Sequence, residues 1–155
     1  MDLSTRICEQ LRPLTLNKLT PSEGFLIIQV NSENLEPALG ILVEQLKIKH
    51  LSTITGLDLG DGIGLDYEFS EANLIIAIRT ILPKTNLKIQ TATKTIPGAI
   101  LYEMEIHDMF GVVFQDHPWM DRKLLLPDNY PADMPPPLLK TSSSEKIRKA
   151  VGIEK

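Results

Sequence analysis

The chain has 155 residues but only one cysteine, Cys8, and it has no apolar run approaching the length that crosses a membrane. A lone cysteine cannot form an internal disulfide and is typical of a reducing compartment, and it leaves no cysteine cluster to hold an iron–sulfur centre. A membrane-spanning helix needs about 20 apolar residues. Charged residues such as Arg6 and Glu9 interrupt the amino-terminal region, which argues against a signal peptide. We expect a protein that carries no electrons itself and reaches a membrane only through partners.

Positive charge is also scarce, because the formal net charge is −4 and the Lys and Arg residues form no basic block. Binding to nucleic acid is therefore not expected, since neutralising phosphates requires clustered basic side chains. The glycines from Gly60 to Gly64 lack the lysine of a phosphate-binding loop and the third glycine of a dinucleotide fingerprint. Asp61-Gly62 among them is a strong hairpin signal, so we interpret this stretch as a turn. No serine lies in a nucleophile-elbow pattern, and no histidine is near Cys8 in the sequence, so a hydrolase is not indicated.

The pattern of apolar residues predicts an α+β fold with a small antiparallel sheet and helices on one face. Residues 1–112 are expected to form this domain, and residues 113–155 an extended, proline-rich docking arm and tail that cannot build a core of its own. Within residues 87–92 a strand and the start of a helix are both possible. Helices are expected over residues 1–11, from about 32 to 49, and over 99–110; strands are expected over residues 25–30, 51–59, 65–70 and 73–81.

The most informative stretch is a predicted helix, residues 99–110, which lies between Pro97 and Gly111. Proline suits the entry to a helix, and glycine suits a left-handed exit. Three carboxylates and a histidine fall within six residues of this short helix, at Glu103, Glu105, His107 and Asp108.

Two interpretations of these residues are open. Glu103 and His107 lie four residues apart on one helical face, and His117 follows ten residues later, so a small metal-dependent or acid/base enzyme is conceivable. Glu103 and Glu105 diverge by about 200° around the helix, which argues against a paired-carboxylate mechanism. The other interpretation is that the carboxylates are solvated, or that they pair with basic groups of the tail or of a partner protein.

The stretch from Glu103 onward resembles the signature of the C subunit, or 30 kDa subunit, of complex I, and of related energy-converting hydrogenases and archaeal deazaflavin dehydrogenases. Residues 51–58 also resemble the strand that opens the sheet hairpin of this family, so the resemblance covers roughly residues 48–130. The matching residues are Glu103, Glu105, Asp108, Phe110, Gly111, Phe114, His117, Pro118, Arg122, Lys123, the leucines 124–126, Pro127 and Asp128.

The sequence departs from the family pattern at several positions. Met104 stands where the family usually has arginine, and Asp116 replaces the glycine before His117-Pro118. One extra residue lies within residues 119–121, ahead of the basic pair. His107 stands where quinone-linked members often carry an aromatic residue, which is more typical of archaeal and hydrogenase-linked relatives.

The resemblance implies a non-catalytic structural subunit in the hydrophilic arm of a membrane-bound, ion-translocating oxidoreductase of the complex I type. It implies docking on the large hydrogenase-like subunit near the quinone, phenazine or hydrogen site, beside iron–sulfur subunits at the cytoplasmic face of the cell membrane. Iron–sulfur clusters, and flavin or nickel, are then expected on partner subunits, with no catalytic, cofactor-binding or metal-binding residue on this chain. NADH, a deazaflavin, ferredoxin, a quinone, a phenazine and protons all stay open as electron donors or acceptors.

We expect the docking contact to combine the matched residues with the neighbouring tryptophan, because an exposed Trp beside Arg is typical of interface hot spots and prolines reduce the entropy lost on binding. The alternative is that the leucines 124–126 close the core of this domain. The expected interface residues are Glu103, Glu105, Asp108, Phe110, Gly111, Phe114, His117, Pro118, Trp119, Arg122, Lys123, Leu126 and Pro127.

Overall fold

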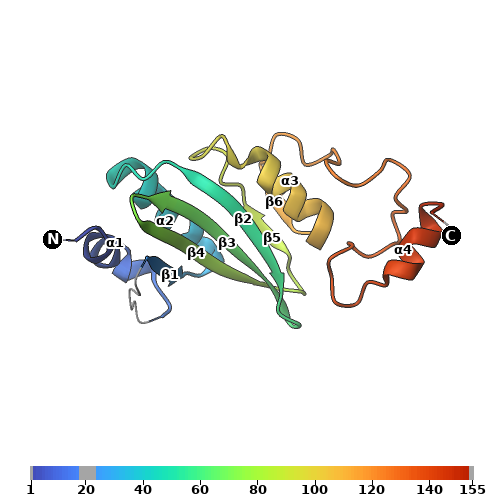
Figure 1. The fold of residues 1–155 in the computed structure, drawn as a ribbon, viewed down its shortest axis with the longest axis horizontal. Coiled ribbons are helices and arrows are strands. Elements are labelled where there is room, and N and C mark those ends of the chain that lie inside the picture. The colour runs from blue at the N-terminus through green and yellow to red at the C-terminus, as the bar shows by residue number, and fades with distance from the viewer. Residues whose placement is uncertain (1, 18–23, 154–155) are drawn as a thin grey trace.

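The computed structural model describes residues 2–17 and 24–153, and its elements follow one another from blue to red in Figure 1. The helices are α1 (Leu3–Leu11), α2 (Leu35–Gly40, continued as a π-helical turn over Ile41–Gln45), α3 (Ala99–Phe110) and α4 (Ser144–Ala150). The strands are β1 (Phe25–Gln29), β2 (Leu51–Asp58), β3 (Gly62–Glu71), β4 (Leu74–Pro83), β5 (Lys88–Gln90) and β6 (Val113–Gln115). Single 3₁₀ turns follow α1 and precede α2. Met1, Glu154 and Lys155, which belong to the predicted first helix and tail, lie outside the described residues.

The main sheet has four strands in the order β1-β4-β3-β2 and is mixed, which corrects the expectation of an antiparallel sheet. β2, β3 and β4 form antiparallel hairpins, as the sequence predicts, but β1 pairs with β4 in parallel. The helical connection through α2 carries the chain from β1 at one edge of the sheet to β2 at the other edge. β1 therefore lies beside β4, the last of the three antiparallel strands. β5 and β6 form a separate parallel pair, so residues 88–90 are a strand and not the start of a helix.

One face of the main sheet packs against the helices. The inward-facing strand residues Leu65, Tyr67 and Phe69 join buried side chains of α1, α2 and α3 in a single core. Gly56 in β2 lets α3 approach closely, because a Cβ atom there would lie 2.4 Å from Cε2 of the Phe110 ring. The predicted placement of the helices on one face is therefore confirmed.

Two boundaries differ from the sequence prediction. The second helix ends at Gln45 rather than near Lys49, and Lys47 then adopts a φ of +63°. β3 begins at Gly62, so the turn is confined to the residues before it, where Gly60 has a φ of +97°. Gly62 and Gly64, which the sequence prediction assigned to the turn, therefore belong to strand β3.

The predicted exit of α3 at Gly111 is confirmed. Gly111 has a φ of +77°, and its N–H donates to the carbonyl of His107 (2.9 Å). A Cβ atom at this position would lie 3.0 Å from Cγ of Pro136, so the left-handed turn also brings a later part of the chain against the helix end.

After β6, residues 116–143 contain no helix or strand, and we call them the C-terminal segment. The segment runs away from the sheet and leads to α4, at the end of the molecule opposite the N-terminus (Figure 1). Ser143 caps α4 by accepting a hydrogen bond from the N–H of Lys146. Residues 144–150 of the predicted extended tail are therefore helical.

Candidate functional site

The carboxyl group of Glu103 lies at the meeting point of α3, β3 and the loop after β5. Oε1 accepts hydrogen bonds from the N–H of Ala92 (2.7 Å) and the hydroxyl of Tyr67 (3.5 Å), and Oε2 bonds the Thr91 hydroxyl (2.5 Å). The Glu103 side chain is fully buried. Burial raises the pKa of Glu103 to about 7, although the hydrogen bonds from Thr91, Ala92 and Tyr67 act in the opposite direction. Glu103 is thus not solvated or paired with a basic tail group, which corrects that interpretation.

His117 packs against this carboxyl group from the start of the C-terminal segment. Its Nε2 lies 3.9 Å from Glu103 Oε2 and 3.1 Å from the carbonyl oxygen of Ile100, and its Nδ1 accepts a hydrogen bond from the N–H of Trp119 (3.1 Å). A carbonyl accepts only, so Nε2 carries the proton and Nδ1 is the acceptor. His117 is therefore a neutral imidazole that fastens the base of the C-terminal segment to α3.

Asp108 makes the second attachment between α3 and the C-terminal segment. A single oxygen, Oδ2, accepts three backbone hydrogen bonds, from the N–H groups of Leu124 (2.8 Å), Leu125 (2.7 Å) and Leu126 (3.1 Å). Three consecutive N–H groups around an anion form a nest, which suits a carboxylate. The side chains of Leu124 and Leu125 remain 38% and 55% exposed, so the anchor holds the backbone while these leucines face outward.

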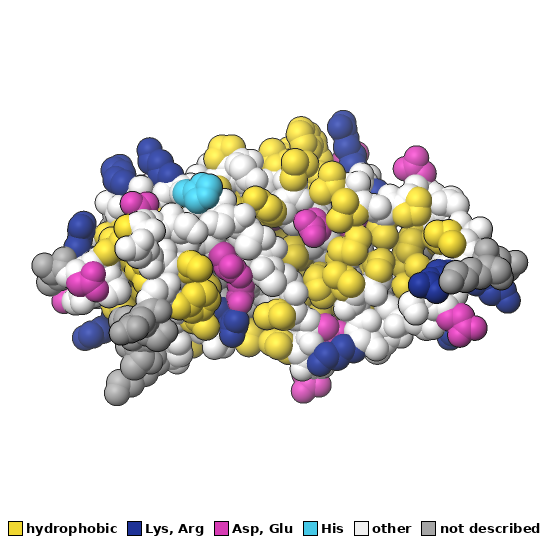
Figure 2. Space-filling view, viewed as in Figure 1, with side chains coloured by type: hydrophobic (Ala, Val, Ile, Leu, Met, Phe, Trp, Pro, Cys, Tyr) yellow, Lys and Arg dark blue, Asp and Glu magenta, His cyan; other side chains and the backbone are white. Residues whose placement is uncertain are grey.

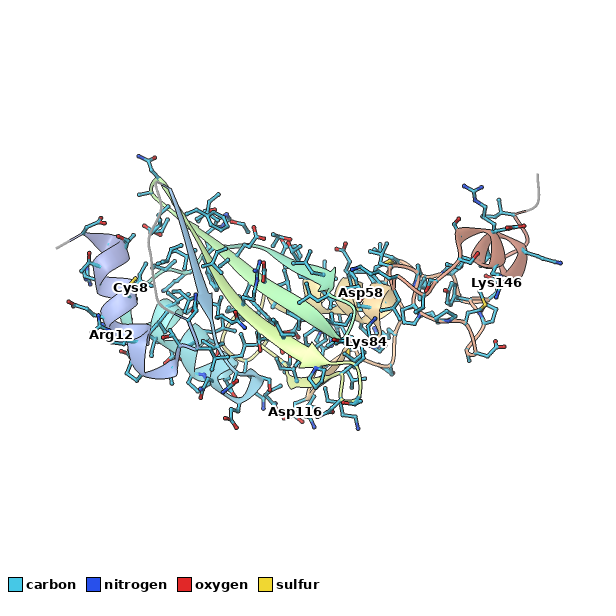
Figure 3. All side chains as sticks on the ribbon, turned by 90° about the horizontal axis from the view of Figure 1, so that it is seen from below. Cys8, Arg12, Asp58, Lys84, Asp116 and Lys146 are labelled. Atoms are coloured by element: carbon cyan, nitrogen blue, oxygen red, sulfur yellow. The ribbon has the colours of Figure 1, made fainter. Side chains whose placement is uncertain are left out.

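Asp58 makes a third attachment at the end of β2. Its carboxylate contacts Lys84 Nζ (2.8 Å) and accepts hydrogen bonds from the N–H groups of Gly60 (2.9 Å) and Lys140 (2.8 Å). Figure 3 shows Asp58 and Lys84 beside each other at the end of the sheet where the C-terminal segment leaves. The bonds from Lys84, Lys140 and Gly60 hold the pKa of Asp58 well below its usual range. Asp58 was not singled out in the sequence, because nothing local indicates that residue 140 returns to it.

The C-terminal segment also satisfies its own polar groups. Lys123 Nζ lies 3.3–3.4 Å from the carbonyl oxygens of Pro127, Asp128 and Tyr130. The Tyr130 hydroxyl donates to the carbonyl of Pro135 (2.7 Å), and Tyr130 is almost fully buried. These bonds close the segment into a loop whose shape does not depend on a helix or strand.

His107 does not join Glu103 and His117. Its Nδ1 donates to the carbonyl of Val112 (2.8 Å), which places the ring at the end of α3. Within residues 2–17 and 24–153, no group of three or more His, Cys, Asp or Glu side chains is arranged to hold a metal ion. Because the Glu103 and His117 side chains are both fully buried, the arrangement offers no access for a substrate.

The outer surface around α3 and the C-terminal segment carries several large apolar side chains. Figure 2 shows hydrophobic side chains gathered over the half of the viewed face that holds these elements. Leu101 (54%), Leu138 (55%) and Trp119 (39%) are among the exposed large side chains, and the guanidinium of Arg122 lies 5.9 Å from the centroid of the Trp119 ring.

The residues expected at a partner interface divide into three groups. Those buried within this chain are Glu103, Asp108, Phe110, Phe114 and His117; those exposed are Glu105, Pro118, Trp119, Arg122, Lys123 and Pro127; Gly111 and Leu126 are half-buried. The sequence offered no signal for the polar partners of Glu103, which come from two other parts of the chain.

Comparison with known proteins finds one matching family model and a set of related sequences. The family model described as the respiratory-chain NADH dehydrogenase 30 kDa subunit matches residues 28–147, well over half of the chain. The C/D subunit of NADH-quinone oxidoreductase from Psychrobacter sp. (strain PRwf-1) is 47% identical over 55 residues, covering 36% of this chain and 9% of that protein. The C subunit of the same enzyme from Chloroherpeton thalassium (strain ATCC 35110 / GB-78) is 30% identical over 91 residues, covering 56% of this chain and 38% of that protein.

Two solved structures share the fold. A trypsin-resistant fragment (1-134) of Nqo5 matches with a TM-score of 0.62 and 21% identity, covering 74% of this chain and 96% of the fragment. A chain of the membrane-bound sulfane sulfur reductase, an archaeal respiratory membrane complex, matches with a TM-score of 0.71 and 22% identity, covering 97% of this chain and 90% of that one. In the part of the chain that the structure describes, no helix has the length and apolar character needed to span a bilayer.

Proposed function

This chain belongs to the family of the respiratory-chain NADH dehydrogenase 30 kDa subunit, and we propose that it is a non-catalytic structural subunit of a membrane-bound complex of the complex I type. It docks on the large hydrogenase-like subunit, beside the iron–sulfur subunits and near the quinone, phenazine or hydrogen site, at the cytoplasmic face of the membrane. Iron–sulfur clusters, with flavin or nickel, reside on those partners.

The observation that carries this proposal is the way the C-terminal segment is built. Its backbone is anchored inward, on Asp108 and Asp58, while the large apolar side chains of Leu124, Leu125 and Leu138 face outward. Exposed leucines on a fixed backbone are typical of a surface that another protein covers. Trp119 and Arg122 lie on the same segment, and these residue types dominate interface hot spots.

The relatives support a large-subunit partner. The C/D subunits of NADH-quinone oxidoreductases join a C part and a D part in one chain. The match covers only 9% of the Psychrobacter protein, so this chain corresponds to a small part of that polypeptide. We infer that the same association forms here through the exposed residues of the C-terminal segment.

Co-purification with the large subunit from the same genome tests the proposal. Leu125→Asp places a charge at the centre of the proposed surface without touching the core, because the Leu125 side chain is 55% exposed. A hot-spot loss of about 2 kcal/mol weakens association roughly 30-fold. Leu16→Asp is the matched control, because Leu16 is also 55% exposed but lies near the N-terminal end of the molecule.

We expect Leu125→Asp to lose the large subunit and Leu16→Asp to retain it, with both variants showing the thermal melting of the parent chain. Equal recovery of the large subunit with both variants would refute docking through the C-terminal segment.

A further inference from the structure

Glu103 is a fully buried ionisable group beside the base of the C-terminal segment, and a chain of hydroxyl groups leads away from it. The Thr91 hydroxyl lies 2.5 Å from Glu103 Oε2 and 2.9 Å from the Thr93 hydroxyl, and it also accepts the N–H of Thr93 (3.2 Å). Thr93 is half-buried, so the chain runs from the fully buried carboxyl group towards the surface.

We propose that Glu103 is a proton-binding site that exchanges its proton with solvent through the Thr91 and Thr93 hydroxyl groups, and that its charge state is transmitted to His117 at the base of the C-terminal segment. The ligand of this site is a proton, and the site lies wholly within this chain. The inference therefore does not depend on the identity of a partner subunit.

Both charge states leave the hydroxyl chain fully bonded. With neutral Glu103, Oε2–H donates to Thr91, and Thr91 donates to Thr93. On release, the Oε2 proton passes to Thr91 Oγ1, the former Thr91 proton passes to Thr93, and the former Thr93 proton passes to water. The products are a carboxylate and a hydronium ion. Thr91 then donates to Oε2 and accepts from Thr93, and uptake of a proton from water reverses the transfers and restores the first direction. The other oxygen, Oε1, accepts from Ala92 and Tyr67 throughout.

Of the ionisable groups around Glu103, His117 is the one that responds to the charge of Glu103. Tyr67 faces Glu103 from β3, and burial raises the pKa of its hydroxyl far above neutrality, so it stays protonated. On the segments packed against the site, Lys94 and Asp116 pair with each other (3.0 Å) and are more than half exposed.

The remaining ionisable groups of α3 are engaged elsewhere or face solvent. His107 bonds the Val112 carbonyl, Asp108 bonds backbone N–H groups, and Glu105 is exposed. Among the residues that the structure describes, no Lys or Arg side chain therefore neutralises an ionised Glu103, and His117 Nε2 lies 3.9 Å from its Oε2.

The effect on His117 follows from its bonding. The Nε2 proton is shared with the Ile100 carbonyl, and a new negative charge at 3.9 Å competes for it. Rotation of the ring towards Glu103 disturbs Nδ1, which accepts the N–H of Trp119. The burial that raises the pKa of Glu103 to about 7 places this change near neutral pH. The base of the C-terminal segment is thus held more firmly below neutrality than above it.

Titration of the full chain labelled with ¹³C at the glutamate side-chain carboxyl tests the binding site. We expect one resonance with a midpoint near pH 7, absent from Glu103→Gln and retained in the matched control Glu105→Gln, an exposed residue of the same helix. Absence of any glutamate titrating above about pH 6, or its persistence in Glu103→Gln, overturns the proposal.

Trp119 is the only tryptophan, so its fluorescence reports on the base of the C-terminal segment. We expect a fluorescence step with the same midpoint in the parent chain and in Glu105→Gln. It should be absent from Glu103→Gln and from His117→Gln, although His117→Gln keeps the carboxyl titration. A step that survives in Glu103→Gln arises from another group and overturns the link to His117.

Thr93→Val tests the path of the proton. It leaves the Thr91 bond to Glu103 in place but ends the chain one hydroxyl short of solvent, so exchange slows and the glutamate resonance broadens or splits at its midpoint. An unchanged line shape in Thr93→Val overturns the hydroxyl route.

Discussion

Replacing Asp108 by alanine removes the carboxylate oxygen that accepts the N–H groups of Leu124, Leu125 and Leu126. Hydrogen bonds to a charged group contribute about 1.5–3 kcal/mol each, but these three share one oxygen and one charge, so they do not add. We therefore assign about 2–4 kcal/mol to the whole anchor. Asp108→Asn keeps an acceptor but loses the charge, and roughly half of that value is expected to remain.

Amide hydrogen exchange at residues 124–126 measures this anchor directly. A loss of about 2–4 kcal/mol raises the rate of local opening by roughly 30- to 1,000-fold in Asp108→Ala, and Asp108→Asn should fall between it and the parent chain. Thermal melting should change little, because Leu124 and Leu125 are exposed and add nothing to the core. The control is Glu105→Ala, which changes an exposed carboxylate on the same helix.

The result that refutes this reasoning is equal exchange at residues 124–126 in the parent chain and in Asp108→Ala. The anchor would then contribute nothing in solution. A collapse of the whole fold in Asp108→Ala would also contradict it, because the hydrogen bonds of this carboxylate hold the backbone of a surface segment.

Three further outcomes are expected. Burial raises the pKa of Glu103 from 4.5 to about 7, so the contribution of Glu103 to stability is fully present below about pH 4.5 and lost as pH rises to about 7. At about 1.4 kcal/mol per pKa unit, Glu103→Gln at about pH 8 should have a free energy of unfolding up to about 3 kcal/mol above that of the parent chain. Urea unfolding at about pH 4.5 should show no such difference. Thr80→Val should raise the free energy of unfolding by about 1 kcal/mol, because the buried Thr80 hydroxyl makes no hydrogen bond to any residue that the structure describes; unchanged or lower stability would contradict this assignment. Gly111→Val should lower stability by about 1–2 kcal/mol, since the site has a φ of +77° with Pro136 3.0 Å from an added Cβ; an unaltered melting temperature would contradict that turn.

Helix α3 was predictable from sequence because its signals are local. Pro97 and Gly111 mark its ends within the chain itself, and the left-handed exit follows from the residue type. The hairpins of the main sheet were predictable for the same reason. The parallel pairing of β1 with β4 was not, because either edge of the three-stranded meander could accept β1, and the choice depends on how the α2 connection packs.

The opposite directions of Glu103 and Glu105 were predictable from the sequence, but the interpretation of Glu103 as solvated or paired with a basic group was wrong. Two residues apart on a helix, Glu103 and Glu105 must face roughly opposite ways, so when one faces solvent the other faces the sheet. The structure places Glu105 outside and Glu103 inside. The donors from β3 and from the loop after β5 make burial of Glu103 tolerable, and their approach is a property of the tertiary fold.

The difference between local sequence signals and tertiary contacts also explains which features of the C-terminal segment were predictable. Its prolines and leucines predicted a stretch without a core of its own, and the exposed leucines agree with that. The composition did not show that carboxylates of the folded domain, Asp108 and Asp58, hold its backbone through N–H groups, which any residue except proline could supply. A segment fixed in this way loses less conformational entropy when a partner covers it than a free chain does. Although Asp108 is itself buried, the proposed docking therefore predicts that substituting Asp108 or Asp58 weakens association, because the surface is loosened while its apolar side chains stay unchanged.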